Sequence, residues 1–255
     1  MSWLTAKHRV KAYCAAAALL GTCSVAMASS DTEQFARFKD PNQWAAPAGN
    51  LMQHRYSALK EINTDNVKDL QFAWAQSSGA LRGHEGQPLV INDVGGKPMM
   101  FIISGCPEMS KCNIVQALDL SDPDNPVQAW SYVKTSGRDE SAVPRACCDT
   151  VNRGGSYADG KFVFGTLDGY VIALDAKTGK EAWVVKHAHP DKGETITPAP
   201  IIANDKVMIG FGGDEFAARG RFTAYNLADG KKVWECQSTG SDKDEIGRAS
   251  CRERV

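Results

Sequence analysis

The chain has 255 residues, of which 43% are hydrophobic, and its formal net charge is −1. This charge becomes more negative once the basic leader described below is removed, which argues against a nucleic acid as the partner. Eight cysteines are present, but the chain has neither a doubled Cys-x-x-Cys motif nor a Cys-x-x-Cys-His motif. The sequence therefore shows neither the spacing of a zinc site nor that of a covalently bound haem.

Residues 1–28 have the features of a secretory leader. Lys7, Arg9 and Lys11 give a positive start, an apolar run follows, and Ala26-Met27-Ala28 fits a cleavage site. The apolar run is too short to span a bilayer, so we expect no transmembrane anchor. The sequence therefore predicts a periplasmic protein that is cleaved near Ala28 and folds where disulfides persist.

Residues 29–67 mix turn formers with short apolar runs. Residues 41–47 have the composition of a loop, and residues 62–67 suggest a short helix or a capped turn. We expect this N-terminal segment to pack on the domain that follows and not to form a domain of its own.

A short strand motif of the type Ala-Leu-Asp recurs along the chain, each time followed by a turn and a tryptophan. The three copies lie at residues 116–119, 172–175 and 223–226, and their tryptophans are Trp130, Trp183 and Trp234. Trp74 begins the series, and successive tryptophans are 56, 53 and 51 residues apart. Self-similarity at such a period indicates a repeat architecture.

Each period divides into about four short strands separated by turns such as Asp-Gly and Thr-Gly. In the best-defined copy we expect strands at 198–203, 206–211, 221–226 and 232–236. Such a pattern is typical of antiparallel hairpins, and four strands per period indicate propeller blades. The sequence therefore predicts an all-β fold, a β-propeller with four-stranded antiparallel blades and about three and a half blades in residues 68–244. The incomplete blade is represented by its last strand, which we expect around Trp74 at residues 72–74. One tryptophan per blade is large enough to pack between neighbouring blades, so we assign these residues a structural role.

Two cysteine pairs stand out in the mature chain. Cys106 and Cys112 bracket a short loop and could form a disulfide. Cys147 and Cys148 are adjacent, which leaves two interpretations open: a strained eight-membered disulfide ring, or two reduced thiols side by side. Strain of that kind persists where the surroundings hold it, and it often marks a functional site.

Residues 245–255 break abruptly from the repeat. They look like the translation of a sequencing adapter, so we expect a non-native tail. Three and a half blades are too few to close a propeller, which also favours a truncated gene product.

Three runs, in this order, resemble the methanol dehydrogenases that depend on pyrroloquinoline quinone (PQQ). They are residues 50–63, the run Gly83-His84-Glu85-Gly86, and residues 147–154, within a similarity that extends from residue 43 to residue 244. The adjacent cysteines with Arg153 narrow the resemblance to PQQ alcohol dehydrogenases. The Gly-His-Glu-Gly run narrows it further to the methanol type, including its lanthanide-using branch. This resemblance implies an N-terminal fragment of an eight-bladed quinoprotein propeller, with PQQ and a metal ion on its axis.

The resemblance also implies cofactor contacts. Cys147 and Cys148 match a vicinal disulfide that lies against one face of PQQ. Arg153 matches a residue beside the quinone oxygens, where a fixed cation stabilises developing negative charge. Glu85 and Thr197 match polar contacts of PQQ, although by themselves they would be a solvated loop acid and an ordinary strand residue.

Residues 212–215 match the family's metal-binding segment. Glu215 corresponds to the metal-ligating glutamate, and its carboxylate suits Ca²⁺ or a trivalent lanthanide. Gly212, Gly213 and Asp214 stand where the family commonly has Ser-Gly-Ala beside a PQQ carboxylate. The hydroxyl contact is therefore lost in this chain, whereas backbone N–H contacts can survive the change.

The implied activity is the oxidation of methanol or another primary alcohol to the aldehyde, with electrons passed to a c-type cytochrome. A small subunit or a homodimer is a further expected partner. The family's catalytic aspartate and its metal-binding asparagine lie beyond residue 244, so we expect no catalytic base in this chain and an inactive fragment. Two alternatives are a PQQ alcohol dehydrogenase of ethanol type and a non-enzymatic propeller scaffold. Such scaffolds need neither adjacent cysteines nor the Gly-His-Glu-Gly run.

Overall fold

The computed structural model describes residues 30–80, 83–105, 114–134, 139–146 and 149–239. The predicted leader, the tail and both cysteine pairs, Cys106 with Cys112 and Cys147 with Cys148, lie outside these residues. The described part begins with a helix, α1 (Ser30–Lys39), which we did not expect from the sequence. Its acidic first turn and basic last turn suit the helix dipole. No helix among the described residues is long and apolar enough to cross a membrane.

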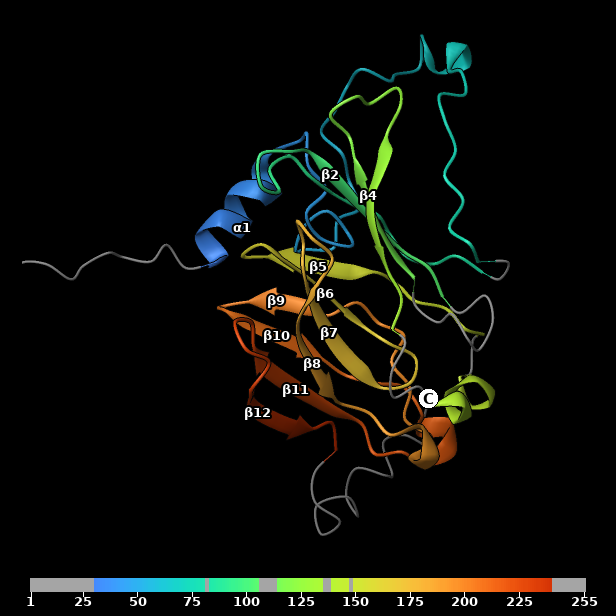
Figure 1. The fold of residues 1–255 in the computed structure, drawn as a ribbon, viewed down its shortest axis with the longest axis vertical. Coiled ribbons are helices and arrows are strands. Elements are labelled where there is room, and N and C mark those ends of the chain that lie inside the picture. Colours follow the sequence, from blue (N-terminus) through green and yellow to red (C-terminus); the bar gives the residue numbers. More distant parts are fainter. Residues whose placement is uncertain (1–29, 81–82, 106–113, 135–138, 147–148, 240–255) are drawn as a thin grey trace, which may run out of the picture.

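Strands in the described residues form three four-stranded sheets, each built from consecutive strands in antiparallel order (Figure 1). The first sheet comprises β1 (Leu89–Ile91), β2 (Met99–Ile103), β3 (Val115–Asp119) and β4 (Val127–Tyr132). The second sheet comprises β5 (Gly155–Ala158), β6 (Lys161–Gly165), β7 (Tyr170–Asp175) and β8 (Glu181–Lys186). The third sheet comprises β9 (Ile201–Ala203), β10 (Lys206–Ile209), β11 (Arg221–Asn226) and β12 (Lys232–Gln237). Short 3-10 helices lie in the connections: η1 (Val67–Asp69), η2 (Glu140–Arg145), η3 (Pro190–Lys192) and η4 (Asp214–Phe216). The predicted four-stranded antiparallel blades are thereby confirmed.

The strand limits agree with the expected ones to within a few residues. β11 has the predicted bounds, whereas β9 begins at Ile201 instead of residue 198. Pro198 and Pro200 lack the backbone N–H that a ladder requires, which explains the late start. The predicted turn near residues 62–67 is present, since the Val67 amide donates to the Asn63 carbonyl.

The recurring alanine and tryptophan are cross-strand partners. Ala117 lies opposite Trp130, Ala173 opposite Trp183, and Ala224 opposite Trp234. In each blade the register shifts immediately after this alanine. A bulge of this kind bends the strand and increases its twist, so the repeat specifies the same bend in all three blades.

Trp130 and Trp183 also join their blades to the next one. The Trp130 indole N–H donates to the Ala176 carbonyl at 3.1 Å, and the Trp183 indole N–H donates to the Leu227 carbonyl at 2.9 Å. The rings pack on Gly179 and Gly230, where an added Cβ would lie 2.7 Å and 2.8 Å from an indole carbon. The glycines of the Thr-Gly and Asp-Gly turns therefore leave the space in which the tryptophan ring of the preceding blade packs.

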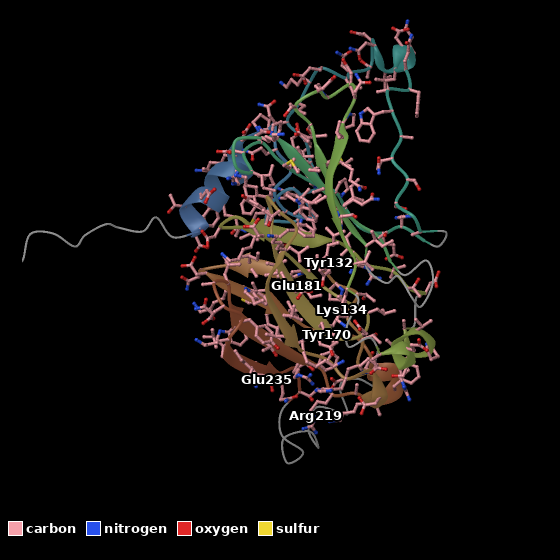
Figure 2. The ribbon with its side chains drawn as sticks, in the orientation of Figure 1. Tyr132, Lys134, Tyr170, Glu181, Arg219 and Glu235 are labelled. Atoms are coloured by element: carbon pink, nitrogen blue, oxygen red, sulfur yellow. The ribbon has the colours of Figure 1, made fainter. Side chains whose placement is uncertain are left out.

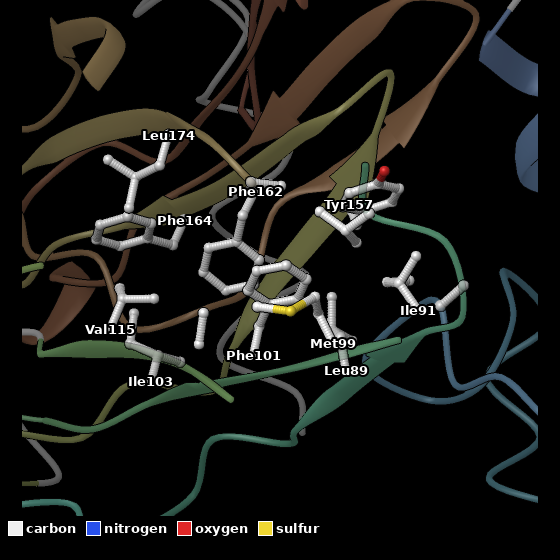
Figure 3. Packing of buried hydrophobic residues seen from close by; sticks show 14 of the residues in the cluster. Leu89, Ile91, Met99, Phe101, Ile103, Val115, Tyr157, Phe162, Phe164 and Leu174 are labelled. Atoms are coloured by element: carbon white, nitrogen blue, oxygen red, sulfur yellow. The ribbon is translucent and has the colours of Figure 1, made fainter. Parts of the chain in front are cut away.

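Two apolar clusters fill the spaces between the blades. The first lies between the first and second sheets (Figure 3), where the Phe101 and Phe162 rings stack with their centroids 5.1 Å apart. The second lies between the second and third sheets and includes Val163 and Val207. Burying a large apolar side chain contributes about 2 kcal/mol, so these clusters supply the main cohesion between blades.

Residues 72–74, which we expected to form the last strand of a preceding blade, are not in a strand. A strand needs a hydrogen-bonded neighbour, and no described strand pairs with this stretch. Phe72 is 82% exposed, and the segment runs away from the sheets in Figure 1. Trp74 nevertheless donates its indole N–H to the Pro123 carbonyl at 3.1 Å, so it reproduces the contact of the later tryptophans.

A buried histidine lies between the second and third blades. His187 is 3% exposed, and its Nδ1 lies 2.9 Å from the Tyr225 hydroxyl. Its buried Nε2 has no hydrogen-bond partner among the described residues. Burial and the nearby Arg221 guanidinium lower the pKa of His187 to about 4, against the smaller opposing influence of Glu194 and of Glu235, which is labelled in Figure 2.

Replacing Trp183 by phenylalanine should destabilise the chain by about 2 kcal/mol, because the buried Leu227 carbonyl loses its donor and the interface loses packed area. Urea unfolding measures this loss. Trp234→Phe is the matched control, since Trp234 is 39% exposed and should change the unfolding free energy by less than about 0.5 kcal/mol. Equal losses in both variants would contradict inter-blade docking through Trp183.

Stability should also fall as the pH drops from about 6.5 towards about 4. In this range the unfolded His187 takes up a proton while the buried ring stays neutral, so acid favours the unfolded state. The difference between the two pKa values corresponds to on the order of 3 kcal/mol. Urea unfolding between pH 4 and pH 7 should give a shallower pH dependence for His187→Gln than for the parent. Identical slopes would show that His187 does not carry the effect.

Candidate functional site

Three of the predicted cofactor residues lie just before the first strand of a blade. Glu85 precedes β1, Arg153 precedes β5, and Thr197 precedes β9. The first strands are neighbours in space, since β5 contacts both β1 and β9. The entries to three blades therefore converge, and residues up to 112 positions apart in the sequence meet at one place.

Arg153 forms the centre of this group. Its Nε lies 3.1 Å from a Glu85 carboxylate oxygen, and its Nη1 donates to the Thr197 hydroxyl at 2.7 Å. The Arg153 backbone N–H also donates to the Thr197 carbonyl at 2.9 Å. The side chains of Arg153 and Glu85 remain 46% and 44% exposed. Such an exposed ion pair adds little to stability, so its groups are available to a ligand.

A glycine allows Glu85 to approach this group. An added Cβ at Gly86 would lie 2.6 Å from the Ile103 carbonyl oxygen and 3.1 Å from that of Asn152. The run Gly83-His84-Glu85-Gly86 can thus pass between two backbones only with glycine at position 86. The exposed His84 instead faces the Ser78 hydroxyl, at 2.7 Å from its Nε2.

A cavity of about 510 Å³ opens beside Glu85 and Arg153. Its wall includes Arg55, a second cation that we did not predict, and the apolar residues 198–202. The volume is in the usual range of small-molecule sites. Two guanidinium groups, one carboxylate and an apolar wall suit a flat ligand that carries negative charge.

The segment that contains Glu215 is attached to the same blade entry. Gly212 and Thr195 exchange two backbone hydrogen bonds of 2.9 Å and 3.1 Å, two residues before Thr197. Gly213 has a φ of +134°, and an added Cβ would lie 2.1 Å from the Gly193 carbonyl oxygen. The Gly212 N–H donates to the Thr195 carbonyl, and the predicted contact of Gly212 with the cofactor stays a prediction.

Glu215 and Asp214 lie in η4 with exposed side chains. Carboxylate oxygens are the donors that hard cations prefer. The described residues contain no group of three or more histidine, cysteine, aspartate or glutamate side chains placed to hold a metal ion. Within this part of the chain Glu215 is therefore one oxygen donor, and the role of metal ligand stays a prediction.

A largely buried ion pair stabilises the backbone next to the Glu215 segment. Arg221 donates to both Glu194 oxygens at 2.8 Å and 3.1 Å, and the His189 N–H donates to the same carboxylate at 2.9 Å. Burial alone would raise the pKa of Glu194, but these donors outweigh it and hold the pKa below its usual value. Since Glu194 directly precedes Thr195, this pair fixes the backbone on which Gly212 is aligned.

The vicinal cysteines cannot be placed in this site, because Cys147 and Cys148 lie outside the described residues. Their predicted disulfide and its contact with PQQ stay predictions, as does the disulfide between Cys106 and Cys112.

Replacing Gly86 by alanine should destabilise the chain by about 2 kcal/mol, because the new methyl group meets two backbone carbonyls that cannot easily move. Thermal or urea unfolding measures the loss. Gly83→Ala in the same loop is the control, since its Cβ would lie at an ordinary 3.8 Å from Val151. If both alanines are tolerated equally, the close approach at position 86 is not a constraint.

Comparison with known proteins shows the family to which the chain belongs. A family model described as "PQQ: Glucose/ethanol/alcohol dehydrogenase, beta-propeller domain" matches residues 44–253. The match extends into the segment that we expected to be a non-native tail, so the origin of residues 245–255 stays a prediction.

Among curated proteins, the chain is 46% identical over 232 residues to the "Lanthanide-dependent methanol dehydrogenase" of Methylacidiphilum fumariolicum (strain SolV), covering 91% of this chain and 36% of that protein. It is 41% identical over 212 residues to "Methanol dehydrogenase (cytochrome c) subunit 1" of Methylobacterium organophilum, covering 81% of this chain and 32% of that protein. The chain thus spans about a third of the length of the curated relatives it matches.

Solved structures give the same result. A "Europium-containing methanol dehydrogenase" superposes with a TM-score of 0.76 at 46% identity, over 84% of this chain and 35% of that one. The quinohemoprotein alcohol dehydrogenase from Comamonas testosteroni superposes with a TM-score of 0.72 at 33% identity, over 87% of this chain and 32% of that one. With its tryptophan-linked blades, the chain belongs to the PQQ family of glucose, ethanol and alcohol dehydrogenase β-propellers.

Proposed function

We propose that this chain is part of a longer periplasmic enzyme that oxidises methanol or another primary alcohol to the aldehyde with PQQ and a Ca²⁺ or lanthanide ion. The observation that carries the proposal is that Arg153 contacts both Glu85 and Thr197 beside a cavity that Glu85 and Arg153 line. It is supported by 46% identity to a protein named as a lanthanide-dependent methanol dehydrogenase.

The donors around the cavity suit PQQ, which is planar and carries carboxylates. Arg153 offers a cation whose direction is fixed by Glu85 and Thr197, and Arg55 offers a second cation from the same wall. When bound, PQQ supplies the two-electron oxidation. In this proposal Arg153 binds the anionic edge of the ring and stabilises the charge that develops on it, because a guanidinium held in place needs no reorganisation during the reaction.

Glu215 is the residue that we propose as a metal ligand in this chain. Its carboxylate would bind a hard cation and hold it beside the cofactor, where such an ion acts as a Lewis acid. Gly213 and Asp214 stay candidates for contacts with a PQQ carboxylate, whereas the Gly212 amide is used by Thr195. The remaining metal ligands and the catalytic base would come from residues beyond those described.

Two features support the proposed location and partner. The predicted leader would direct the protein to the periplasm, where a c-type cytochrome is a suitable electron acceptor. A relative at 41% identity is named "Methanol dehydrogenase (cytochrome c) subunit 1", which supports a cytochrome c and a further subunit as partners, and a second copy of the chain is the alternative we propose. Ethanol-type enzymes are the runner-up, since quinone alcohol dehydrogenases match at 38% identity in Gluconobacter oxydans (strain 621H).

The test is to produce the complete protein and to add PQQ with either Ca²⁺ or a lanthanide. We expect PQQ binding, seen as a change in its absorbance, and alcohol-dependent reduction of a dye or cytochrome. Binding without turnover of any primary alcohol would reject the dehydrogenase and favour a binding propeller.

Arg153→Gln should raise the Kd for PQQ at least tenfold, because the cation that faces the anionic ligand is removed. PQQ titration by absorbance or fluorescence measures this without reference to turnover. Lys97→Gln is the control, since Lys97 also pairs with a carboxylate, that of Asp119, but in a turn remote from the cavity. If the two variants bind PQQ alike, Arg153 is not a cofactor contact.

A further inference from the structure

Asn152 immediately precedes Arg153 and is almost completely buried, at 2% exposure. Its side-chain Nδ2 donates to the Gly165 carbonyl at 2.8 Å, at the end of β6. Its Oδ1 accepts the Gly154 N–H at 2.9 Å. One amide group therefore links the blade-entry loop to the second sheet and closes a tight turn around Arg153.

The backbone on both sides of Arg153 is held by this arrangement. Gly154 has a φ of +117°, a conformation that glycine adopts without strain, and its amide is the one bound by Asn152. The Arg153 amide itself donates to the Thr197 carbonyl. Since the positions before and after Arg153 are tied to the sheet, the long side chain starts from a fixed point and a fixed direction.

Asn152 also limits the distance between Arg153 and Glu85. An added Cβ at Gly86 would lie 3.1 Å from the Asn152 carbonyl oxygen, so the backbone beside Glu85 packs directly on the backbone beside Arg153. Asn152 thus packs on Gly86, which follows Glu85, and binds Gly154, which follows Arg153. A displacement of Asn152 would therefore move the Glu85 carboxylate and the Arg153 guanidinium relative to each other.

Few side chains can replace this amide. The site needs a donor towards the Gly165 carbonyl and an acceptor for the Gly154 amide, both from a short, planar group. An aspartate keeps the acceptor but directs a second oxygen at the Gly165 carbonyl, unless it carries a proton. Alanine and leucine supply neither, and they leave two buried backbone groups without a partner.

We propose that Asn152 is a positioning residue that aims the Arg153 guanidinium at an anionic ligand in the cavity, which in the proposed function is PQQ. This inference rests on the proposed function for the identity of the ligand. The alternative is that Asn152 only forms hydrogen bonds with two buried backbone groups and stabilises the fold, without any specific influence on the ligand.

Asn152→Asp separates the two alternatives through its pH dependence. When the aspartate is protonated, its hydroxyl can donate to the Gly165 carbonyl and restore the arrangement. When it is ionised, two oxygens repel each other at a buried position, which displaces Arg153. In the complete protein we therefore expect the Kd for PQQ to be close to that of the parent at pH 5 and at least tenfold higher at pH 9. The parent should show no comparable change, and Asn152→Ala should bind weakly across the whole range.

Trp183→Phe is the control for a loss of stability alone, since it weakens an inter-blade contact without touching the cavity. Melting temperatures are measured for every variant at each pH, so that affinities are compared at similar losses of stability. We expect Trp183→Phe to keep the parent Kd for PQQ while Asn152→Ala does not.

Three outcomes would overturn the proposal: parent-like PQQ binding by Asn152→Ala, a pH-independent Kd in Asn152→Asp, or an equal loss of affinity in Trp183→Phe. If the parent protein itself fails to bind PQQ, the proposed function is wrong and this inference falls with it. If the parent binds PQQ and only the Asn152 results differ from expectation, the proposed function stands and the positioning role alone is rejected.

Discussion

The contact on which the rest of the structure depends is the indole of one blade seated on the glycine turn of the next. Trp130 and Trp183 each donate to a carbonyl in the following blade, and each packs on a glycine that leaves room for the ring. Together with the apolar clusters between the blades, this ring-on-glycine contact holds neighbouring blades against each other. Because the first strands then lie side by side, the short segments that lead into them are brought together, and those segments carry the candidate site.

The candidate site therefore forms through the packing of successive blades and not from one local stretch of sequence. Glu85, Arg153 and Thr197 belong to three different blade entries and meet only when all three blades are docked. Glycines with no catalytic chemistry are as necessary as the charged residues, since Gly86 and Gly213 allow backbones to approach more closely than any side chain permits. The half-exposed Glu85–Arg153 pair contributes little to folding by itself, which fits groups kept for a ligand.

The periodic features could be predicted from the sequence, whereas the features created by contact between blades could not. The Ala-to-Trp repeat predicted the blades and the structural role of the tryptophans because it is a short-range signal repeated three times. Glu85, Thr197 and Glu215 were found through the family resemblance, since each by itself is an ordinary polar residue of a loop or strand. Asn152 and Arg55 were missed, because the burial of one and the cavity beside the other arise only when the blade entries pack together. Residues 72–74 do not form the predicted strand, because a strand needs a hydrogen-bonded neighbour and no described strand pairs with them.

The two ligands proposed for the site depend on the chain to different degrees. The organic cofactor would meet a prepared surface here, because Arg153 is held on both sides by backbone hydrogen bonds and opens on a formed cavity. The described residues offer the metal ion few ligands, since Ca²⁺ takes six to eight oxygen ligands and Glu215 provides at most two of them. An ion bound by Glu215 would then need further oxygen ligands from outside the described residues, even though Arg221 and Glu194 hold the neighbouring backbone in place. Under the proposed function, this part of the propeller would therefore orient the organic cofactor, whereas the choice of metal would depend on the remaining ligands.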